Sequence, residues 1–310
     1  MGVFVLLPLL LPLTAWPIAH LATQHLHPRA ATTVLSVVAA VMAVCSTLCL
    51  GLLMVVGTAQ LPGNPLPDGW SDPEVRESVP QDEIAGKAAI PLLLAVVGGC
   101  GRTLWRHFRV RRQAHAALTG LRDTSVAVLP DAEPYAYALP AGPRDRIVVS
   151  TGMLDRLDAQ ERRALFAHER AHLAARHHRH LLIAQLAAQA NPFLLPLRTA
   201  VVYVAERWAD EEAAHRVGSR KAVARAIGKA ALVSRGTPGP TLAGLAAPGP
   251  LPRRVAALLA PAPPARTWPP LFTAVGLALW SAAAGAALSA TFSANSAVTL
   301  LLLLHAATPL

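Results

Sequence analysis

The chain has 310 residues, of which 53% are hydrophobic and 15% charged, and its formal net charge is +10. This composition is too apolar for an ordinary soluble domain of this length and indicates an integral membrane protein. The basic residues lie beside apolar stretches without a helix-turn-helix or an alternating basic and aromatic pattern, so we expect no direct binding of nucleic acid.

Three apolar stretches in the first third of the chain predict three transmembrane helices, at about 3–19, 31–57 and 84–105. An acidic loop, 58–83, lies between the second and the third. Five arginines lie at or just after the end of the third stretch: Arg102, Arg106, Arg109, Arg111 and Arg112. Because positive charge beside a span marks the cytoplasmic side, we expect a multi-pass protein of the plasma or inner membrane whose N-terminus and acidic loop are extracytoplasmic.

The segment 106–266 has the residue pattern of a globular domain, which we expect to be cytoplasmic. Three short stretches within it predict strands, namely Ser125–Leu129, Glu133–Pro140 and Arg146–Ser150. The last strand is followed at once by the motif helix described next. Its residues Ile147, Val148 and Val149 are therefore a candidate edge strand that holds an extended peptide substrate by backbone pairing.

The sequence His-Glu-Arg-Ala-His, which begins at His168, is the H-E-x-x-H pattern of zinc hydrolases. An uninterrupted helix is expected here, because Asp158 is a suitable N-cap and Glu161 completes a capping box. On a helix, His168 and His172 share one face and can bind one metal ion, while Glu169 lies beside them. The pattern is short enough to arise by chance, so its surroundings decide its meaning.

A helical hairpin is predicted after the motif, because Asn191-Pro192 and Pro196 interrupt two apolar helical stretches that are short for a membrane span. The second helix of the hairpin carries Glu206 and, four residues later, Asp210. A hydrolytic zinc site usually has three protein ligands, so Glu206 is the candidate third ligand and Asp210 the candidate acceptor for a ligand histidine N–H. A surface carboxylate is the alternative for Glu206, although its apolar neighbours favour a buried ligand.

In a zinc hydrolase, the metal activates a water molecule and Glu169 would take its proton during attack on a peptide carbonyl. The developing oxyanion needs a further donor, and the sequence offers four without choosing: Tyr135, Tyr137, His215 and Arg254. A polar run with His177, His178 and His180 is expected to continue the motif helix as a solvated face. Of these three, His177 is the candidate for contact with the site.

The C-terminal segment, 267–310, follows a proline-rich linker and contains a fourth apolar stretch at about 271–290, which predicts another membrane helix. The residues 293–310 are apolar at their centre. The sequence leaves open whether they form a fifth span or a helix on the outer surface.

Four stretches, taken in order, resemble the membrane zinc metallopeptidases of the HtpX and CaaX prenyl protease group: Pro134–Pro140, Arg146–Leu154, His168–His172 and Glu206–Asp210. The short interval between His172 and Glu206 is more similar to the BlaR/MecR-type antirepressor peptidases. The resemblance extends over about 126–258. H-E-x-x-H followed by E-x-x-A-D is far more specific than either motif alone.

This resemblance implies one zinc ion per chain, bound by His168, His172 and Glu206, with Glu169 as the catalytic base and Asp210 supporting a ligand. It implies a zinc metalloendopeptidase in regulated proteolysis, whose partners are the lipid bilayer and a protein substrate such as a transcriptional repressor. No Ser-x-x-Lys and Lys-Thr-Gly pair follows the last span, so direct β-lactam sensing is not expected.

The expected fold is a mostly α integral membrane protein, in which transmembrane helices flank a small α+β zincin-like (gluzincin) metalloprotease domain. Two alternatives remain: an HtpX-like quality-control protease, and a non-catalytic membrane receptor whose zinc only stabilises the domain. Glu169 weighs against the receptor, because a purely structural zinc site needs no carboxylate beside an open position. The sequence determines neither the substrate, nor the activating signal, nor the oligomeric state. The resemblance also does not identify the oxyanion donor. In the HtpX group a His-Pro usually precedes the arginine that Arg254 matches, and this sequence lacks that His-Pro.

Overall fold

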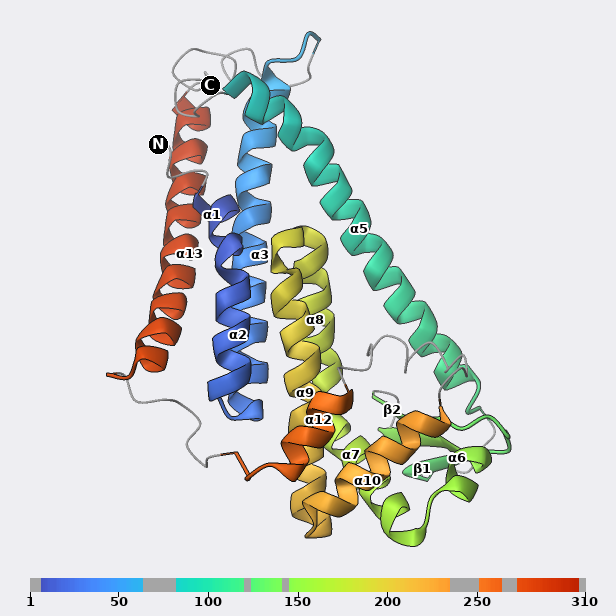
Figure 1. The fold of residues 1–310 in the computed structure, drawn as a ribbon. Helices are drawn as coiled ribbons and strands as arrows, with labels where there is room; N and C mark the ends of the chain where they lie inside the picture. Colours follow the sequence, from blue (N-terminus) through green and yellow to red (C-terminus); the bar gives the residue numbers. More distant parts are fainter. Residues whose placement is uncertain are drawn as a thin grey trace.

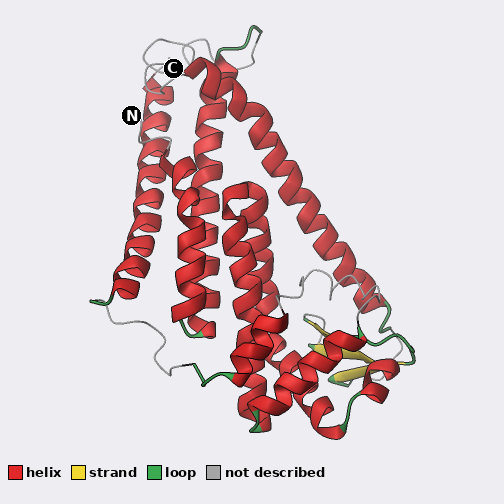
Figure 2. Cartoon of the chain, viewed as in Figure 1, coloured by secondary structure: helices red, strands yellow, loops and turns green. Residues whose placement is uncertain are grey.

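A computed structural model describes the residues 7–63, 82–119, 124–140, 145–234, 251–263 and 272–306. The chain is mostly helical, as predicted, and contains one small sheet (Figure 1, Figure 2). Long helices form an elongated bundle. The sheet and several shorter helices lie at one end of this bundle, and the C-terminal ends of the long helices α3 and α13 lie toward the other end (Figure 1).

Three helices in the described part of the chain are long and apolar enough to cross a membrane: α3 (Pro28–Ala59), α5 (Asp82–Ala116) and α13 (Ala274–Ala306). The helix α5 continues well beyond residue 105, where the sequence predicted its end. The helix α13 is continuous, because no proline interrupts it. The apolar tail is therefore neither a fifth span nor a separate surface helix, and its residues up to Ala306 extend the predicted fourth span.

The first apolar stretch is divided into short helices, so the prediction of one helix at 3–19 is wrong for its described part. The pieces are α1 (Leu7–Leu10), the 3-10 helix η2 (Leu11–Thr14) and α2 (Ala15–His25). Prolines in this stretch cause the division, because each lacks a backbone N–H and its ring crowds the preceding helical turn. One of them, Pro12, is the second residue of η2.

The predicted helical hairpin is present and consists of α8 (His177–Ala190), the 3-10 helix η4 (Pro192–Leu194) and α9 (Leu195–Val217). The hairpin packs against α3, with α5 beside it (Figure 1). At its tip, the side chain of Asn191 accepts from the backbone N–H of Phe193 and donates to Ser46 of α3 at 3.1 Å. Because a buried amide needs such partners, this contact fixes the tip of the hairpin to the bundle.

The sheet contains all three predicted strands: β1 (Val126–Leu129), β2 (Ala136–Leu139) and β3 (Arg146–Ser150). Their order is β1-β3-β2, with β1 parallel and β2 antiparallel to β3. Since β3 pairs on both sides, the prediction that Ile147, Val148 and Val149 form an edge strand is wrong. These residues are at most 1% exposed, and such an unbroken apolar run is typical of a central strand covered on both faces.

Among the described residues, four further helices lie at the same end of the bundle as the sheet: α6 (Thr151–Arg156), α7 (Ala159–Ala174), α10 (Arg220–Val233) and α12 (Leu251–Leu259). The helix α7 carries the H-E-x-x-H motif and begins with the predicted capping box of Asp158 and Glu161. It ends at Ala174, so the expectation that it continues through His180 is wrong. The reason is Arg176, whose φ of 53° is left-handed and starts α8 in a new direction.

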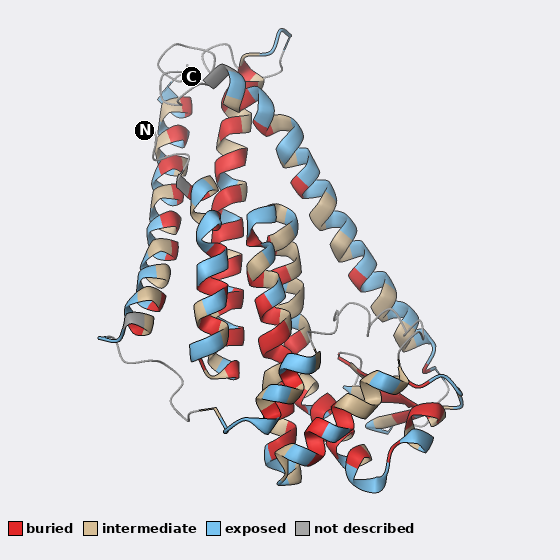
Figure 3. Ribbon diagram, viewed as in Figure 1, coloured by how far each residue is buried: buried red, intermediate tan, exposed pale blue. Residues whose placement is uncertain are grey.

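Buried residues are concentrated on the inner face of α3 and where α7, α9 and the sheet meet (Figure 3). The helices α5 and α13 instead expose many large apolar side chains, including Leu94 at 66% and Leu301 at 67%. Exposed apolar surface on this scale is unfavourable in water and suits contact with lipid. The burial pattern therefore agrees with a protein that is embedded in a membrane.

The crossing of α3 and α5 yields the first prediction. A Cβ on Gly57 would collide with the backbone of Gly86, whereas Gly51, on the same helix, has nothing within 4 Å. We expect Gly57→Ala to lower the midpoint of thermal unfolding in detergent by several degrees, because overpacking costs about 1–3 kcal/mol. The matched control Gly51→Ala should leave it unchanged or raise it slightly, since alanine favours a helix. Equal midpoints for the two variants would contradict this close approach.

Candidate metal centre

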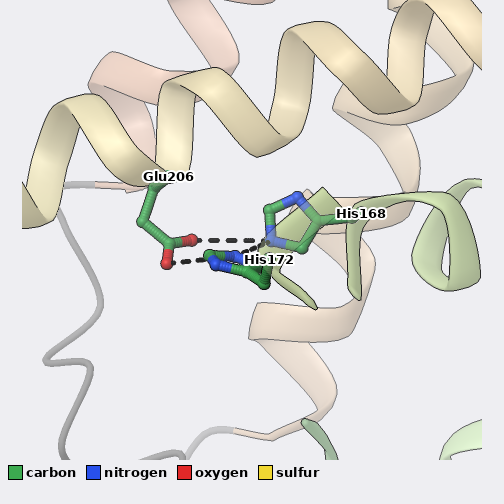
Figure 4. Close-up of side chains that lie close together, drawn as sticks. All are labelled: His168, His172 and Glu206. Carbon is green, nitrogen blue, oxygen red and sulfur yellow. Dashed lines mark hydrogen bonds and ion pairs between the residues drawn. The ribbon is translucent and has the colours of Figure 1, made fainter. Parts of the chain in front are cut away.

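The helices α7 and α9 cross so that the three predicted ligand residues face one another (Figure 4). The Nε2 atoms of His168 and His172 are 3.0 Å apart. The carboxylate of Glu206 faces both, with one oxygen 3.6 Å from His168 Nε2 and the other 3.5 Å from His172 Nε2. The described part of the chain thus brings together the two histidines of α7 and the glutamate of α9.

The spacing and chemistry of this cluster fit a zinc ion. Two ligand atoms about 2.0–2.1 Å from a tetrahedral zinc lie about 3.3–3.4 Å apart. The three observed separations, 3.0, 3.5 and 3.6 Å, bracket that value. Two imidazoles and one carboxylate are also a typical donor set of catalytic zinc sites, in which the fourth position is left for water. His168, His172 and Glu206 could therefore hold zinc without rearrangement of the helices.

Asp210 lies behind His168, one turn after Glu206 on α9. Its Oδ1 is 3.0 Å from His168 Nδ1, although the ring N–H is not aligned well enough for a regular hydrogen bond. The contact is an ion pair when the histidine is charged. It leaves Nε2 of His168 directed at the other ligands, as expected for a carboxylate that orients a metal-binding histidine.

Arg254 of α12 reaches the same two carboxylates and is itself buried. Its Nε and Nη2 donate to Asp210 at 2.8 and 2.7 Å, and its Nη1 lies 2.8 Å from Glu206 Oε2. Although burial opposes ionisation, this guanidinium holds the pKa of Glu206 well below its usual range. The arginine therefore keeps both carboxylates charged and ties α12 to α9.

Glu169, the predicted base, is buried beside His168, and its carboxylate accepts from the backbone N–H of Ala138 in β2. Burial raises the pKa of Glu169 above its ordinary value, and the positive charge of His168 opposes this shift only in part. A raised pKa makes a carboxylate a better proton acceptor. Glu169 is thus suited to general base catalysis beside the ligand cluster.

The two histidines differ in their electrostatic surroundings. Burial alone would lower the pKa of His168, but the carboxylates of Asp210 and Glu206 raise it to about 10. For His172, burial dominates and lowers the pKa to about 4. The histidine with the carboxylate partner is therefore the more basic ligand, and the other stays neutral and ready to bind a metal through its lone pair.

Of the predicted oxyanion donors, only Arg254 lies at the cluster, and its guanidinium is occupied by Glu206 and Asp210. His215 is exposed at the end of α9, nine residues after Glu206 and so about 13 Å further along the helix. Tyr137 belongs to a buried apolar cluster with Leu118, on the face of the sheet opposite Ala136. The structure therefore does not support His215 or Tyr137 in this role.

The sheet order makes both β1 and β2 edge strands, and of the two β2 is the one that lies against the motif helix α7. Next to the first residue of β2, the backbone N–H of Ser150 donates to the carbonyl of Tyr135, and the N–H of Tyr135 donates to the hydroxyl of Ser150. In an antiparallel ladder the backbone groups of alternate residues face away from the partner strand, so Ala136 presents its N–H and C=O at the outer edge of β2, whereas the N–H of Ala138 donates to Glu169. An extended peptide can therefore pair with β2 beside Glu169, at the strand next to the one that the sequence indicated.

Two features of the site escaped sequence analysis. Arg254 was considered only as an oxyanion donor, because its distance of 44 residues from Asp210 gives no sign that the two pair. Trp208 of α9 packs its ring on His177, at a centroid distance of 4.7 Å, and was treated as an apolar neighbour of Glu206. The only signal for the tryptophan was its position two residues after the candidate ligand.

The model of peptidase family M48 matches residues 101–186 of the chain. The matched part includes the end of α5, the sheet and the motif helix α7, whereas Glu206 and Arg254 lie beyond it. Comparisons with curated proteins and with solved structures gave no match. The similarity to M48 implies a metallopeptidase, and the three long apolar helices agree with its association with a membrane.

Loss of Arg254 should destabilise the protein. Arg254→Met leaves Asp210 and Glu206 buried without their cation, and we expect the free energy of unfolding of the metal-free protein to fall by about 3 kcal/mol. The neighbouring Arg253 is exposed and lies over the ring of Tyr203, so Arg253→Met is the matched control, with an expected loss of less than about 1 kcal/mol. Denaturant titration in detergent measures both. If the free energy of unfolding fell as little in Arg254→Met as in Arg253→Met, the buried ion pairs of Arg254 would contribute little to stability.

Proposed function

We propose that this protein is an integral membrane zinc endopeptidase, which cleaves a protein substrate on the cytoplasmic side of the membrane. One observation carries the proposal: His168, His172 and Glu206 converge with the spacing of zinc ligands, and buried Glu169 lies beside them. The similarity of residues 101–186 to peptidase family M48 supports the same reaction class.

The residues of the chain divide the chemistry among them. A zinc ion at this site would supply a Lewis acid and lower the pKa of a water molecule toward neutrality. Glu169 takes the proton of that water and passes it to the leaving amine of the cleaved peptide bond. Asp210 orients His168, and Arg254 keeps Glu206 and Asp210 ionised, so the cluster is prepared before substrate arrives.

The free edge of β2 suggests how a substrate is held. The outward N–H and C=O of Ala136 can pair with an extended peptide, which would place a scissile carbonyl near Glu169 and the ligand cluster. Backbone pairing requires an extended chain, so the substrate is a flexible segment of a protein. This requirement suits regulated cleavage of a partner such as a transcriptional repressor, the role that the BlaR/MecR resemblance implies.

The proposed orientation rests on charge. The arginines of α5 lie toward the end of the bundle where the metal domain lies, and positive charge beside a span favours the cytoplasm. The helices α3, α5 and α13 would then cross the membrane, which puts the ends of α3 and α5 that flank the predicted acidic loop on the outer side; residues 64–81 of this loop lie outside the described part of the chain.

Metal content and activity test the ligands and the base together. We expect about one zinc per chain in the detergent-purified protein, loss of most zinc in Glu206→Ala, and retention of zinc in Glu169→Gln. Cleavage of casein by Glu169→Gln should fall at least about 100-fold, because general base catalysis is lost. Glu212, which pairs with Arg216 on α9, provides the matched control Glu212→Gln, for which both quantities should stay unchanged. Normal cleavage by Glu169→Gln would contradict the assignment of Glu169 as the base. If the wild type binds zinc without cleaving and Glu169→Gln keeps full biological function, the protein is a zinc-stabilised receptor and not an enzyme.

Labelling with a membrane-impermeant maleimide tests the orientation. In a background without the native cysteines, Ser71→Cys should react in intact cells, whereas Arg216→Cys, at an exposed position of α9, should react only after the cells are opened. The reverse pattern would place the metal domain outside. Zinc content of both variants serves as the check that the site is intact.

A further inference from the structure

We infer that His177 is a positioning residue, whose ring fixes the orientation and the tautomer of the metal ligand His172. The inference rests on the proposed zinc site. His177 is the first residue of α8 and is 0% exposed, and its Nδ1 lies 2.9 Å from His172 Nδ1. The two rings are nearly perpendicular, at 84° and a centroid distance of 4.8 Å.

The direction of this hydrogen bond follows from the metal site. His172 presents Nε2 to His168 and Glu206, and a metal ligand must offer a lone pair at that atom. Neutral His172 then carries its proton on Nδ1 and donates it to His177 Nδ1. The opposite direction would put the proton of His172 on Nε2 and block metal binding. By accepting this proton, His177 stabilises the tautomer of His172 that is able to bind zinc.

The surroundings of His177 hold its ring in this position. His177 Nε2 is buried and has no hydrogen-bond partner among the described residues, so no other polar group competes for the ring. Trp208 packs against it at a centroid distance of 4.7 Å. The guanidinium of Arg29, at the start of α3, lies 5.7 Å from the Trp208 ring centroid. A continuous series of edge-to-face ring contacts and one cation–π contact thus joins the ligand His172 to α9 and to the bundle.

The two ligand histidines are supported by different chemistry. His168 is backed by the carboxylate of Asp210, which adds negative charge as well as orientation. His172 is backed by an imidazole, which accepts a proton without adding charge. Since Glu206 and Asp210 already supply two buried negative charges against Arg254, a third carboxylate behind His172 would need another buried cation. A neutral acceptor provides the orientation without that cost.

Two substitutions of His177 separate this hydrogen bond from mere packing. His177→Phe keeps a ring against Trp208 but has no acceptor, and His177→Asn keeps an acceptor atom near the place of Nδ1 but has no ring. We expect the zinc dissociation constant, measured with a competing chelator on the full chain in detergent, to rise about 10–100-fold in His177→Phe. In His177→Asn it should stay within about threefold of the wild type.

A purely structural role predicts the opposite order, with His177→Phe close to the wild type and His177→Asn weakest. That order, or equal affinities for His177→Phe and the wild type, would overturn the inference. His178→Phe is the matched control at a half-buried neighbour outside the cluster, and it should bind zinc as the wild type does. Substitution by cobalt provides a second readout, because a reoriented His172 should change the visible absorption of bound cobalt in His177→Phe alone.

Failure of this inference about His177 can be distinguished from failure of the proposed zinc site. If the wild type binds no zinc, the metal site itself is wrong, and the inference falls with it. If the wild type binds zinc and Glu206→Ala does not, the site stands and the His177 variants test the inference alone. Should His177→Phe not fold, His177→Leu replaces it as the variant without an acceptor. If neither folds while His177→Asn does, the inference is overturned, because the contact then determines the fold and not the ligand geometry.

Discussion

The central physical constraint in this structure is the burial of two carboxylates one turn apart on α9. Glu206 and Asp210 are 8% and 1% exposed, and ionised groups so far from water require charged or hydrogen-bonding partners. The partners come from two other helices, with His168 on α7 and Arg254 on α12. The pairing of these charges therefore sets how three helices meet. It also creates the only cluster of metal-binding side chains within the described residues.

The helix α9 gives this cluster a direct connection to the membrane part. Its N-terminal half belongs to the hairpin that packs on α3, and its C-terminal half carries the carboxylates (Figure 1). Polar contacts fix the hairpin to α3, including His180 to Ser36 at 3.1 Å. The site is thus built on helices that continue into the bundle. A displacement of α3 would be transmitted directly to α9, because no linker lies between the hairpin and the carboxylates.

The errors of sequence analysis concern the arrangement of elements more than their existence. The strands at 126–129, 136–139 and 146–150 occur where the pattern indicated, yet their order could not be read. Chain order suggested that the strand just before α7 was the edge, whereas β3 lies between its two predecessors. His215 and Tyr137 fit the required chemistry, but helix length and the opposite face of the sheet separate them from the cluster.

The sequence by itself determined the local features: the capped motif helix, the interruption at Asn191-Pro192, the apolar helices and the pairing of His168 with His172 on one face. Each follows from residues close together in the chain, where helical periodicity, capping and proline sterics act directly. Only the tertiary structure decided that Arg254 neutralises Asp210, that Trp208 packs on His177, and that β3 is the central strand. These contacts join residues whose side chains give no sign of one another in sequence, because they depend on how helices cross and how strands are ordered. The sequence offered Glu206 as the candidate third ligand, and the crossing of α7 and α9 brings its carboxylate to 3.5 Å from His172 Nε2.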